Sequence, residues 1–515
     1  MSHHTTLKSR ASSRTSSVQE SIQCSSEMIH DATQHPVENM GITRIIPVAP
    51  SSTTIERCKE KLGNLDRLTK IMSDKSDMSV IKGILILEND MTDEAVETML
   101  RERMVKKFLR FRSRLEHGSF IELMPNELNL KKHIHHIHLP NGQNSEDDMR
   151  LSLSQFINKP FDPRGPLWEA YIVHNCVGGF VMMLRVHHSI GDGAALAMVF
   201  NEFCDQDIEF PDCKPPQMTA LRYIAFVVAF FFLQIINLMR VIWKSLYMVF
   251  GPADLESPIK IPVKTMARQK QISWTKSFDL DLTKQIGRPY RATLNDVMLC
   301  VITGALDRFR RQKCSEDDEL CNLTECDIRC IHPVNTRTSP IIKNPDNDAA
   351  FLFALLPLGI IDPKQRLLEI KNRMDHLKTI NEKFYAKFLI NLLNFLPGRL
   401  LKPAMDWVTS KVSVVVSNVR GPSYSLSING NKIKDCIGFL PSMHGIGISI
   451  CIFSYSGKVR VGLTTDENLT KNPKEDFIRF LEEEYQHMSE VLLPATSLSN
   501  EGNKSASRKR QSTAA

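Results

Sequence analysis

The sequence has few cysteines and little excess charge, and both features exclude classes of protein. Twelve cysteines in 515 residues are too sparse for a disulfide scaffold. Basic residues exceed acidic ones by only seven, so we do not expect nucleic acid as a partner. A mean hydropathy of −0.19 excludes a polytopic membrane protein. With 42% hydrophobic and 24% charged residues, the composition is that of a globular protein.

The N-terminal segment contains no apolar stretch, so the sequence predicts no secretory signal peptide and a cytosolic, reducing environment. Residues 1–40 are rich in serine and threonine and poor in apolar side chains, and 495–515 are similar. We predict a disordered N-terminal extension and a disordered basic tail. The cysteines between 314 and 330 lack paired C-x-x-C spacing, which does not favour a zinc site.

The net charge is concentrated in one stretch of the chain. Residues 213–278 hold nine basic and two acidic side chains, and their balance of +7 equals that of the whole protein. Within this stretch, residues 221–250 are nearly all apolar. The 17 residues between Arg222 and Arg240 fall slightly short of the roughly 20 that cross a bilayer.

We therefore predict that residues 211–270 form a basic, apolar linker with a membrane-associated helix that contacts membrane lipid through 221–250. A spanning helix, a re-entrant helix and an in-plane helix remain open. A core helix of a soluble protein is the alternative, although thirty residues without an acid are long for one.

Strand and helix patterns alternate on both sides of this linker, which predicts an α/β (α+β) protein with two domains, 41–210 and 271–494. In the first half we expect strands at 79–87, 132–139 and 180–186 and helices at 92–109 and 194–203. In the second half we expect strands at 328–333, 412–417, 445–455 and 458–464 and helices at 293–311, 363–377, 387–395 and 474–491.

The strand predicted at 132–139 contains four histidines. His133, His135, His136 and His138 fall two on each face under strand alternation, so they do not converge as a set of metal ligands. We interpret them as surface or packing residues, with metal binding as the alternative.

The most specific pattern is H-H-x-x-x-D-G at 187–193, which chance would produce in about one chain per thousand of this length. It follows a predicted strand, and alternation sends His187 and His188 to opposite faces, so one of them can serve a cleft. An imidazole there is both neutral and basic near pH 7. Asp192 is suited to cap the next helix or pair with an arginine, and Gly193 permits close backbone approach. The alternative is a helix cap after two packing histidines.

The chain contains no G-x-S-x-G, so a covalent acyl-enzyme lacks its usual signature. A histidine that takes the proton of an alcohol, while the alcohol oxygen attacks an acyl thioester, is the simpler chemistry.

The H-H-x-x-x-D-G motif resembles that of the bifunctional wax ester synthase/diacylglycerol acyltransferase family. Further matches follow in the family's order, and the resemblance covers roughly 60–490. They are P-L-W-E at 166–169, N-D-V at 295–297, P-V-N-T-R at 333–337 and N-V-R-G-P at 418–422, where Arg420 replaces the usual proline.

The resemblance implies two CoA-dependent-acyltransferase-like domains, each a mixed sheet flanked by helices, with a channel between them for acyl-CoA and an acceptor alcohol. It also implies that His188 is the general base, that His187 supports it, and that Asp192 orients the loop through an arginine. The candidates for that arginine are Arg112 and Arg114.

The resemblance assigns site-shaping or substrate-binding roles to Gly193, Asn295, Asp296 and Asn418. The alternative for Asn295 is a helix cap without a chemical role. Arg337 could meet a phosphate of CoA or only a structural carboxylate. No metal or prosthetic group is implied.

The implied reaction transfers a long-chain acyl group from acyl-CoA to a fatty alcohol, giving a wax ester, or to diacylglycerol, giving triacylglycerol. We expect the protein at the endoplasmic reticulum membrane, with its catalytic domains facing the cytosol. Three alternatives are a lipid-binding or membrane scaffold protein of the same fold without turnover, acyl transfer to another alcohol such as a sterol, and a peptide-condensing domain. The last normally sits in a multidomain chain.

Overall fold

The computed structural model describes residues 57–493, apart from gaps at 74–78, 141–144, 177–178, 315–325, 338–343 and 380–381 and most of 207–249. All of these residues belong to one compact unit, Arg57–Ala515. The predicted disordered segments, 1–40 and 495–515, lie outside the described residues. The predicted domain boundaries stay a prediction.

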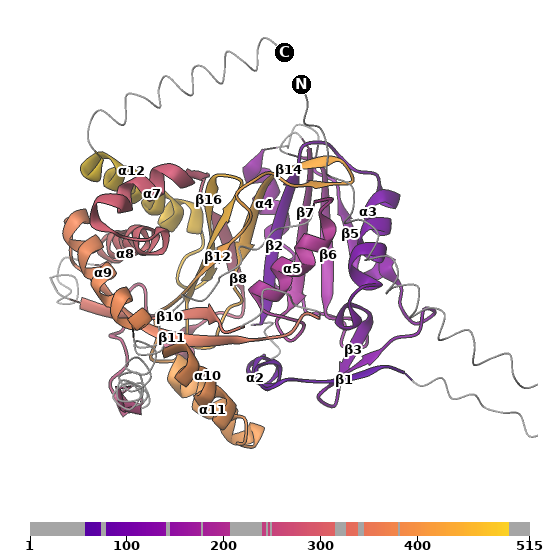
Figure 1. The fold of residues 1–515 in the computed structure, drawn as a ribbon, viewed down its shortest axis with the longest axis horizontal. Coiled ribbons are helices and arrows are strands. Elements are labelled where there is room, and N and C mark those ends of the chain that lie inside the picture. Colours follow the sequence, from indigo (N-terminus) through magenta and orange to yellow (C-terminus); the bar gives the residue numbers. More distant parts are fainter. Residues whose placement is uncertain are drawn as a thin grey trace, which may run out of the picture. The chain divides into compact units, whose positions relative to one another are not determined.

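Two mixed sheets form the core of this unit (Figure 1). The first has the order β13-β14-β2-β7-β6-β5, in which only the β5–β6 pair is parallel. Its strands are β2 (Val80–Leu87), β5 (Ile134–Ile137), β6 (Trp168–Cys176), β7 (Gly179–His187), β13 (Ser427–Ile428) and β14 (Asn431–Phe439).

Apolar layers cover both faces of the first sheet. On one face, Val96 and Met99 of α3 (Asp93–Leu100) and Val199 and Phe203 of α5 (Gly193–Phe203) join one core cluster. On the other, α4 (Glu146–Ser154) contributes Met149 and Leu153 to a second. This two-sided burial explains why β7 is apolar along almost its whole length rather than alternating.

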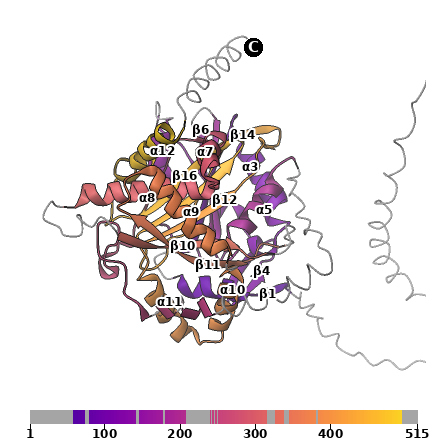
Figure 2. The same ribbon diagram turned by 60° about the vertical axis from the view of Figure 1, so that its left-hand side comes forward.

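The second sheet has the order β11-β10-β12-β15-β16-β8, with β9 paired to β16. Around it lie α7, α8, α9 and α12, as Figures 1 and 2 show. Its strands are β8 (Lys270–Trp274), β9 (Phe278–Asp279), β10 (Cys326–Asn335), β11 (Ala349–Leu358), β12 (Val414–Arg420), β15 (Ile448–Tyr455) and β16 (Lys458–Asp466), and the helices are α7 (Leu280–Gly287), α8 (Leu294–Lys313), α9 (Pro363–Thr379) and α12 (Arg479–Leu492).

The two sheets confirm the predicted α/β class, but they do not divide at the linker. β13 and β14 come from the second half of the chain, yet β14 pairs with β2 in the first sheet, with Ile437 opposite Ile84. Sequence patterning did not reveal this exchange, because an apolar strand pattern does not identify its partner.

The strands and helices predicted from periodicity are present, with shifted ends. The predicted helix 92–109 is shorter: after α3 the chain continues as a π-turn, Arg101–Val105, and a 3₁₀ turn, Leu109–Arg112. Several elements were not predicted. They include β6, β11, β14, α2 (Asn64–Met72), α4 and α11 (Gly398–Thr409).

The predicted apolar linker is described only at its end. Residues 239–250 contribute seven described positions, all helical and exposed, and most of 221–250 falls outside the described residues. Within the part of the chain that the structure describes, no helix has the length and apolarity that a bilayer crossing needs.

A buried ion pair holds α9, α8 and α12 together over the second sheet. Glu484 of α12 pairs with the buried Arg366 of α9, and its other oxygen accepts a hydrogen bond from Arg308 Nε of α8 at 2.8 Å. Glu484→Gln leaves the Arg366 charge unmatched in the core. We expect this variant to lower the free energy of unfolding by about 3 kcal/mol, measured by urea denaturation.

The neighbouring Glu483 provides the matched control. It pairs with Arg308 and Arg479 at the surface, so Glu483→Gln is expected to cost about 1 kcal/mol or less. Equal effects of the two variants would contradict the structural role assigned to Glu484.

Candidate active site

The H-H-x-x-x-D-G motif forms the connection between β7 and α5. Val80 is opposite His187 in the β2–β7 register, and the N–H of His188 donates to the carbonyl of Ser79 at 2.6 Å. The strand ladder therefore extends one residue past β7 and fixes the backbone of His188. The chain then turns, with the N–H of Ile190 donating to the carbonyl of His187 at 2.9 Å.

His188 lines a cavity and is half-buried. Its Nδ1 is enclosed by protein, so the accessible part of the ring lies elsewhere. Burial lowers the pKa of His188, although the carboxylate of Asp192 opposes that effect. The imidazole is therefore neutral near pH 7.

His187 is buried and does not line this cavity. Its Nδ1 accepts a hydrogen bond from the N–H of Ser189 at 3.1 Å, and its Nε2 lies 3.0 Å from the Oγ of Ser73. Burial lowers its pKa to about 4. His187 is thus a neutral, hydrogen-bonded residue that supports the turn.

Asp192 caps α5, as its position in the motif predicts. Its Oδ1 accepts from the N–H of Ala195 at 2.9 Å, and its Oδ2 accepts from Arg337 Nη1 at 2.8 Å and from the N–H of Asp348 at 2.8 Å. Although burial alone would lower the pKa of Arg337, Asp192 and Asp346 raise it above its usual value. The guanidinium therefore stays charged.

Arg337 thus corrects the prediction that Arg112 or Arg114 is the partner of Asp192. Arg112 Nε instead donates to Glu122 at 2.7 Å, and Arg114 Nε donates to Glu116 at 3.0 Å. Sequence proximity to the first half misled the prediction, since the true partner comes from the second half through the P-V-N-T-R segment.

A second arginine, which the sequence analysis missed, supports the same loop. The buried Arg110 donates to the carbonyls of Ser189 and Ile190, both at 3.1 Å, and pairs with Asp66 at 2.9 Å. Asp66 in turn accepts from Asn347 Nδ2 at 2.7 Å. The only signal was the arginine-rich run at 110–114, which does not reveal which of its arginines points inward.

Asn347 completes this network at the turn that follows β7. Its Nδ2 also donates to the carbonyl of His188 at 2.6 Å. The backbone of His188 is therefore held through its N–H by β2 and through its carbonyl by the second half of the chain.

The cavity in front of His188 has a volume of about 640 Å³ and a mostly apolar lining. This volume falls in the range of sites for small organic ligands. Both halves of the chain contribute to its wall, which includes Leu65 and Met72 of α2, Ile84, Phe203, Phe351, Met405, Val415, Ile437, Phe439 and Phe453.

The other predicted site residues divide into two groups. Gly193 and Asn418 line the cavity with His188 and Asp192. A Cβ on Gly193 would meet only Val419, at 3.8 Å, so protein packing does not require a glycine at this position. Asn418 Nδ2 donates to the Oδ1 of Asn295 at 3.3 Å, which places Asn295 directly behind the lining.

Asp296 acts as part of a helix cap. Thr293, rather than Asn295, is the N-cap of α8, and Asp296 completes a capping box by accepting from the N–H of Thr293 at 2.8 Å. The helix cap considered as an alternative for Asn295 is therefore formed by Thr293 and Asp296 instead. For Arg337 the two alternatives were a phosphate of CoA and a structural carboxylate. In the structure it pairs with the carboxylates of Asp192 and Asp346.

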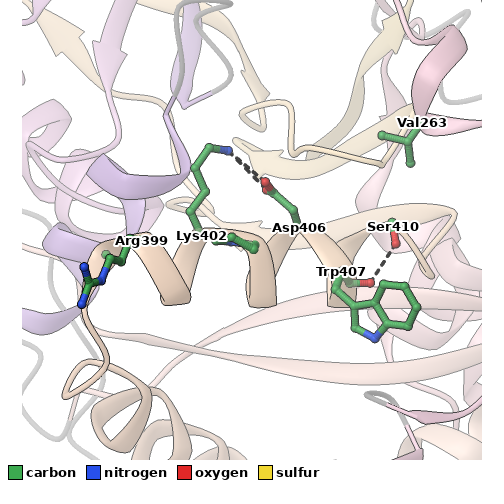
Figure 3. Close-up of a pocket in the computed structure, with 8 residues that line it drawn as sticks. Val263, Arg399, Lys402, Asp406, Trp407 and Ser410 are labelled. Carbon is green, nitrogen blue, oxygen red and sulfur yellow. Dashed lines mark hydrogen bonds and ion pairs between the residues drawn. The ribbon is translucent and has the colours of Figure 1, made fainter.

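A second, open hollow lies along α11 and contains none of the predicted site residues. In Figure 3, Lys402 pairs with Asp406 along the helix, at 3.0 Å, and Ser410 donates to the carbonyl of Trp407. The exposed indole of Trp407 forms part of its wall.

Family models match both halves of the chain. The wax ester synthase/diacylglycerol acyltransferase catalytic domain matches residues 73–224, and the C-terminal domain of the same family matches residues 346–489. Together the two matches span more than half of the sequence. The chain belongs to the wax ester synthase/diacylglycerol acyltransferase family.

Relatives in bacteria and plants agree with this assignment. The O-acyltransferase WSD of Acinetobacter baylyi is 24% identical over 71% of this chain and 82% of its own. Wax ester synthase/diacylglycerol acyltransferase 2 of Arabidopsis thaliana is 23% identical over 70% and 80%.

Solved structures share the fold. The wax ester synthase/diacylglycerol acyltransferase of Marinobacter aquaeolei VT8 superposes with a TM-score of 0.58 at 18% identity, covering 83% of this chain and 98% of that one. The starter condensation domain of rhizomide synthetase, in complex with C8-CoA and Leu-SNAC, gives 0.54 at 11% identity, covering 85% and 96%. The chain therefore shares the fold of these structures.

The Asp192–Arg337 pair can be tested through stability. Arg337→Met leaves the buried carboxylate of Asp192 without its charge partner, so we expect the free energy of unfolding to fall by about 3 kcal/mol. Arg112→Met is the control, because its partner Glu122 is partly exposed, and we expect a loss of about 1 kcal/mol or less. Urea denaturation measures both, and a larger loss for Arg112→Met would refute the assignment.

Proposed function

We propose that the protein is an acyl-CoA-dependent O-acyltransferase that esterifies a fatty alcohol or diacylglycerol, with His188 as general base. The observation that carries this proposal is a neutral imidazole, fixed at a strand end, on the wall of a large apolar cavity built by both halves of the chain. The names of its relatives, which include wax ester synthases and diacylglycerol acyltransferases, supply the substrate classes.

The geometry supports direct activation of the acceptor. Since Nδ1 of His188 is enclosed by protein, the acceptor hydroxyl transfers its proton to Nε2 while its oxygen attacks the thioester carbon. The tetrahedral oxyanion then collapses, the C–S bond breaks, and the CoA thiolate takes the proton back from His188. The protons and electrons of this step balance without a redox partner. As the resemblance implies, we expect no metal or prosthetic group to be needed.

The supporting residues keep this base in place. Asp192 and Arg337 fix the turn after His188. Arg110 donates to the carbonyl of Ser189 in this turn, and Asn347 donates to the carbonyl of His188. Asp192 and His187 are therefore proposed as positioning residues rather than as groups that exchange protons with substrate. Gly193 and Asn418 are proposed to contact substrate, with Asn295 and Asp296 shaping the site behind them.

The acceptor class and the base are tested together. We expect His188→Ala to lower the rate of ester formation from labelled palmitoyl-CoA at least 100-fold, with hexadecanol and dioleoylglycerol supplied and products separated by thin-layer chromatography. The exposed His117 supplies the control His117→Ala, for which no change is expected. Wild-type rates in a folded His188→Ala protein would contradict the base assignment.

Release of free CoA thiol distinguishes turnover from lipid binding. A scaffold protein of the same fold binds acyl-CoA and alcohol but releases no thiol. If the wild type released no free CoA thiol with any of the acceptors, the proposed activity would be overturned.

We also propose that the protein docks on membrane lipid, at the endoplasmic reticulum, with its catalytic cavity on the cytosolic side. Exposed apolar side chains are grouped on neighbouring elements: the described end of the linker, α10 (Glu382–Leu393) and α11. They are Met239, Ile242, Trp243, Leu246, Tyr247, Phe250, Phe384, Phe388, Leu392, Phe395, Leu400 and Trp407.

Contacts join the linker end to α11 within this group. Lys411 Nζ lies 4.7 Å from the ring of Trp407 and donates to the carbonyl of Gly251 at 2.6 Å. Aromatic side chains beside lysines and arginines are typical of surfaces that meet the headgroup region of a bilayer. Such a surface would bring the cavity close to apolar substrates that reside in the membrane.

Docking is measured by co-sedimentation with vesicles of phosphatidylcholine and phosphatidylserine. We expect the double variant Trp243→Ser/Phe250→Ser to bind these vesicles at least tenfold more weakly, because two large apolar side chains no longer enter the interface. Leu151, which is exposed on α4, provides the control Leu151→Ser, with no expected change. Unchanged binding of the double variant would move docking to another surface.

A further inference from the structure

Four side chains with metal-binding chemistry meet on the first sheet, away from the catalytic turn. His136 lies on β5 and His174 on β6, Asp93 is the first residue of α3, and Asp90 precedes that helix. His136 is opposite Ile172 in the parallel β5–β6 register, so His174, two residues further along, projects from the same face. Sequence alternation within one strand did not reveal this pairing.

The potential ligand atoms form a compact triangle. Nδ1 of His136 lies 3.0 Å from Nε2 of His174 and 3.1 Å from Oδ1 of Asp93, and Nε2 of His174 lies 3.2 Å from the same oxygen. A tetrahedral ion with bonds of 2.0–2.1 Å needs ligand atoms roughly 3.3 Å apart. The three atoms are therefore within a few tenths of an ångström of that spacing.

Asp90 supplies the outer contact that metal-binding histidines usually have. Its Oδ1 lies 2.9 Å from Nδ1 of His174, so Nδ1 carries the proton and the lone pair of Nε2 faces the triangle. This carboxylate–histidine arrangement fixes both the tautomer and the orientation of a ligand ring. The ring of His174 also packs edge-on against Phe180, with centroids 6.0 Å apart.

We propose that Asp93, His136 and His174 bind one divalent transition-metal ion of the zinc class, with water as the fourth ligand. Two imidazoles and one carboxylate suit Zn²⁺, whereas Mg²⁺ and Ca²⁺ require oxygen ligands. Within the described part of the chain, no other set of three such side chains has this spacing. Cys326 and Cys330 of the cysteine cluster are free thiols and do not belong to it.

The position of this site indicates a structural function. β7 runs from the end of the sheet near His174 to the end that carries His188, and its nine residues span roughly 30 Å. The ion therefore takes no part in the chemistry at His188. It ties α3 to the edge strand β5 and its neighbour β6, which already pair with each other through the backbone of the sheet.

The proposal is tested on the full-length chain after treatment with a chelator. The wild type is titrated with Zn²⁺, and the bound metal is measured by mass spectrometry after gel filtration. We expect it to retain one equivalent more than His136→Ala/His174→Ala. We expect Asp90→Asn to weaken zinc binding 10- to 100-fold, because it removes only the outer contact.

Two further variants separate the site from other histidines and from effects on folding. Asp93 is exposed, so Asp93→Ala leaves the fold intact, and we expect at least a tenfold loss of zinc affinity. His117→Ala is expected to bind as the wild type does. Zinc should raise the melting temperature of the wild type and not that of Asp93→Ala.

Equal zinc stoichiometry and equal melting shifts in the wild type and Asp93→Ala would overturn the proposal. The cluster would then be a hydrogen-bond network only. A titration with Mg²⁺ that produced the same saturable binding would also overturn it, because the site would not have the proposed metal class.

Discussion

The ion pair between Asp192 and Arg337 joins the loop that carries His188 to the other half of the chain. Asp192 belongs to the turn between β7 and α5, whereas Arg337 follows β10 of the second sheet. Both side chains are buried, so each charge requires the other. The position of the imidazole therefore depends on the relative placement of the two sheets, and so does the cavity, whose wall comes from both.

This dependence is reinforced by contacts on either side of the pair. Arg110 and Asp66 bring the region before the first sheet to the same loop, and Asn347 links Asp66 to the carbonyl of His188. Because these groups are enclosed and mutually hydrogen-bonded, they restrict the turn to one arrangement. Sequence variation in the cavity wall can then alter the shape of the cavity while His188 stays in place.

Much of the fold and part of the site could be predicted from the sequence. Local signals located β2, β7, α5 and α8, since periodicity and capping act over a few residues, and Asp192 was recognised as a helix cap. The arginine partner of Asp192, the role of Arg110 and the meeting of His136 with His174 depend on which strands become neighbours. That information lies in tertiary packing, and one sequence does not contain a readable signal for it. Asn295 and Asp296 show the same limit. The sequence located the motif, but only the structure shows that Asp296 caps α8 whereas Asn295 contacts Asn418.

The exchange of β14 into the first sheet has a consequence for how the protein is made. Until residue 439 has left the ribosome, β2 is an edge strand, and a row of its backbone N–H and C=O groups lacks its partner. The first half of the chain cannot complete its sheet during synthesis of the linker and most of the second half. Its exposed strand edge is then a natural point of contact for molecular chaperones, and separate expression of the first half would leave that edge open to aggregation.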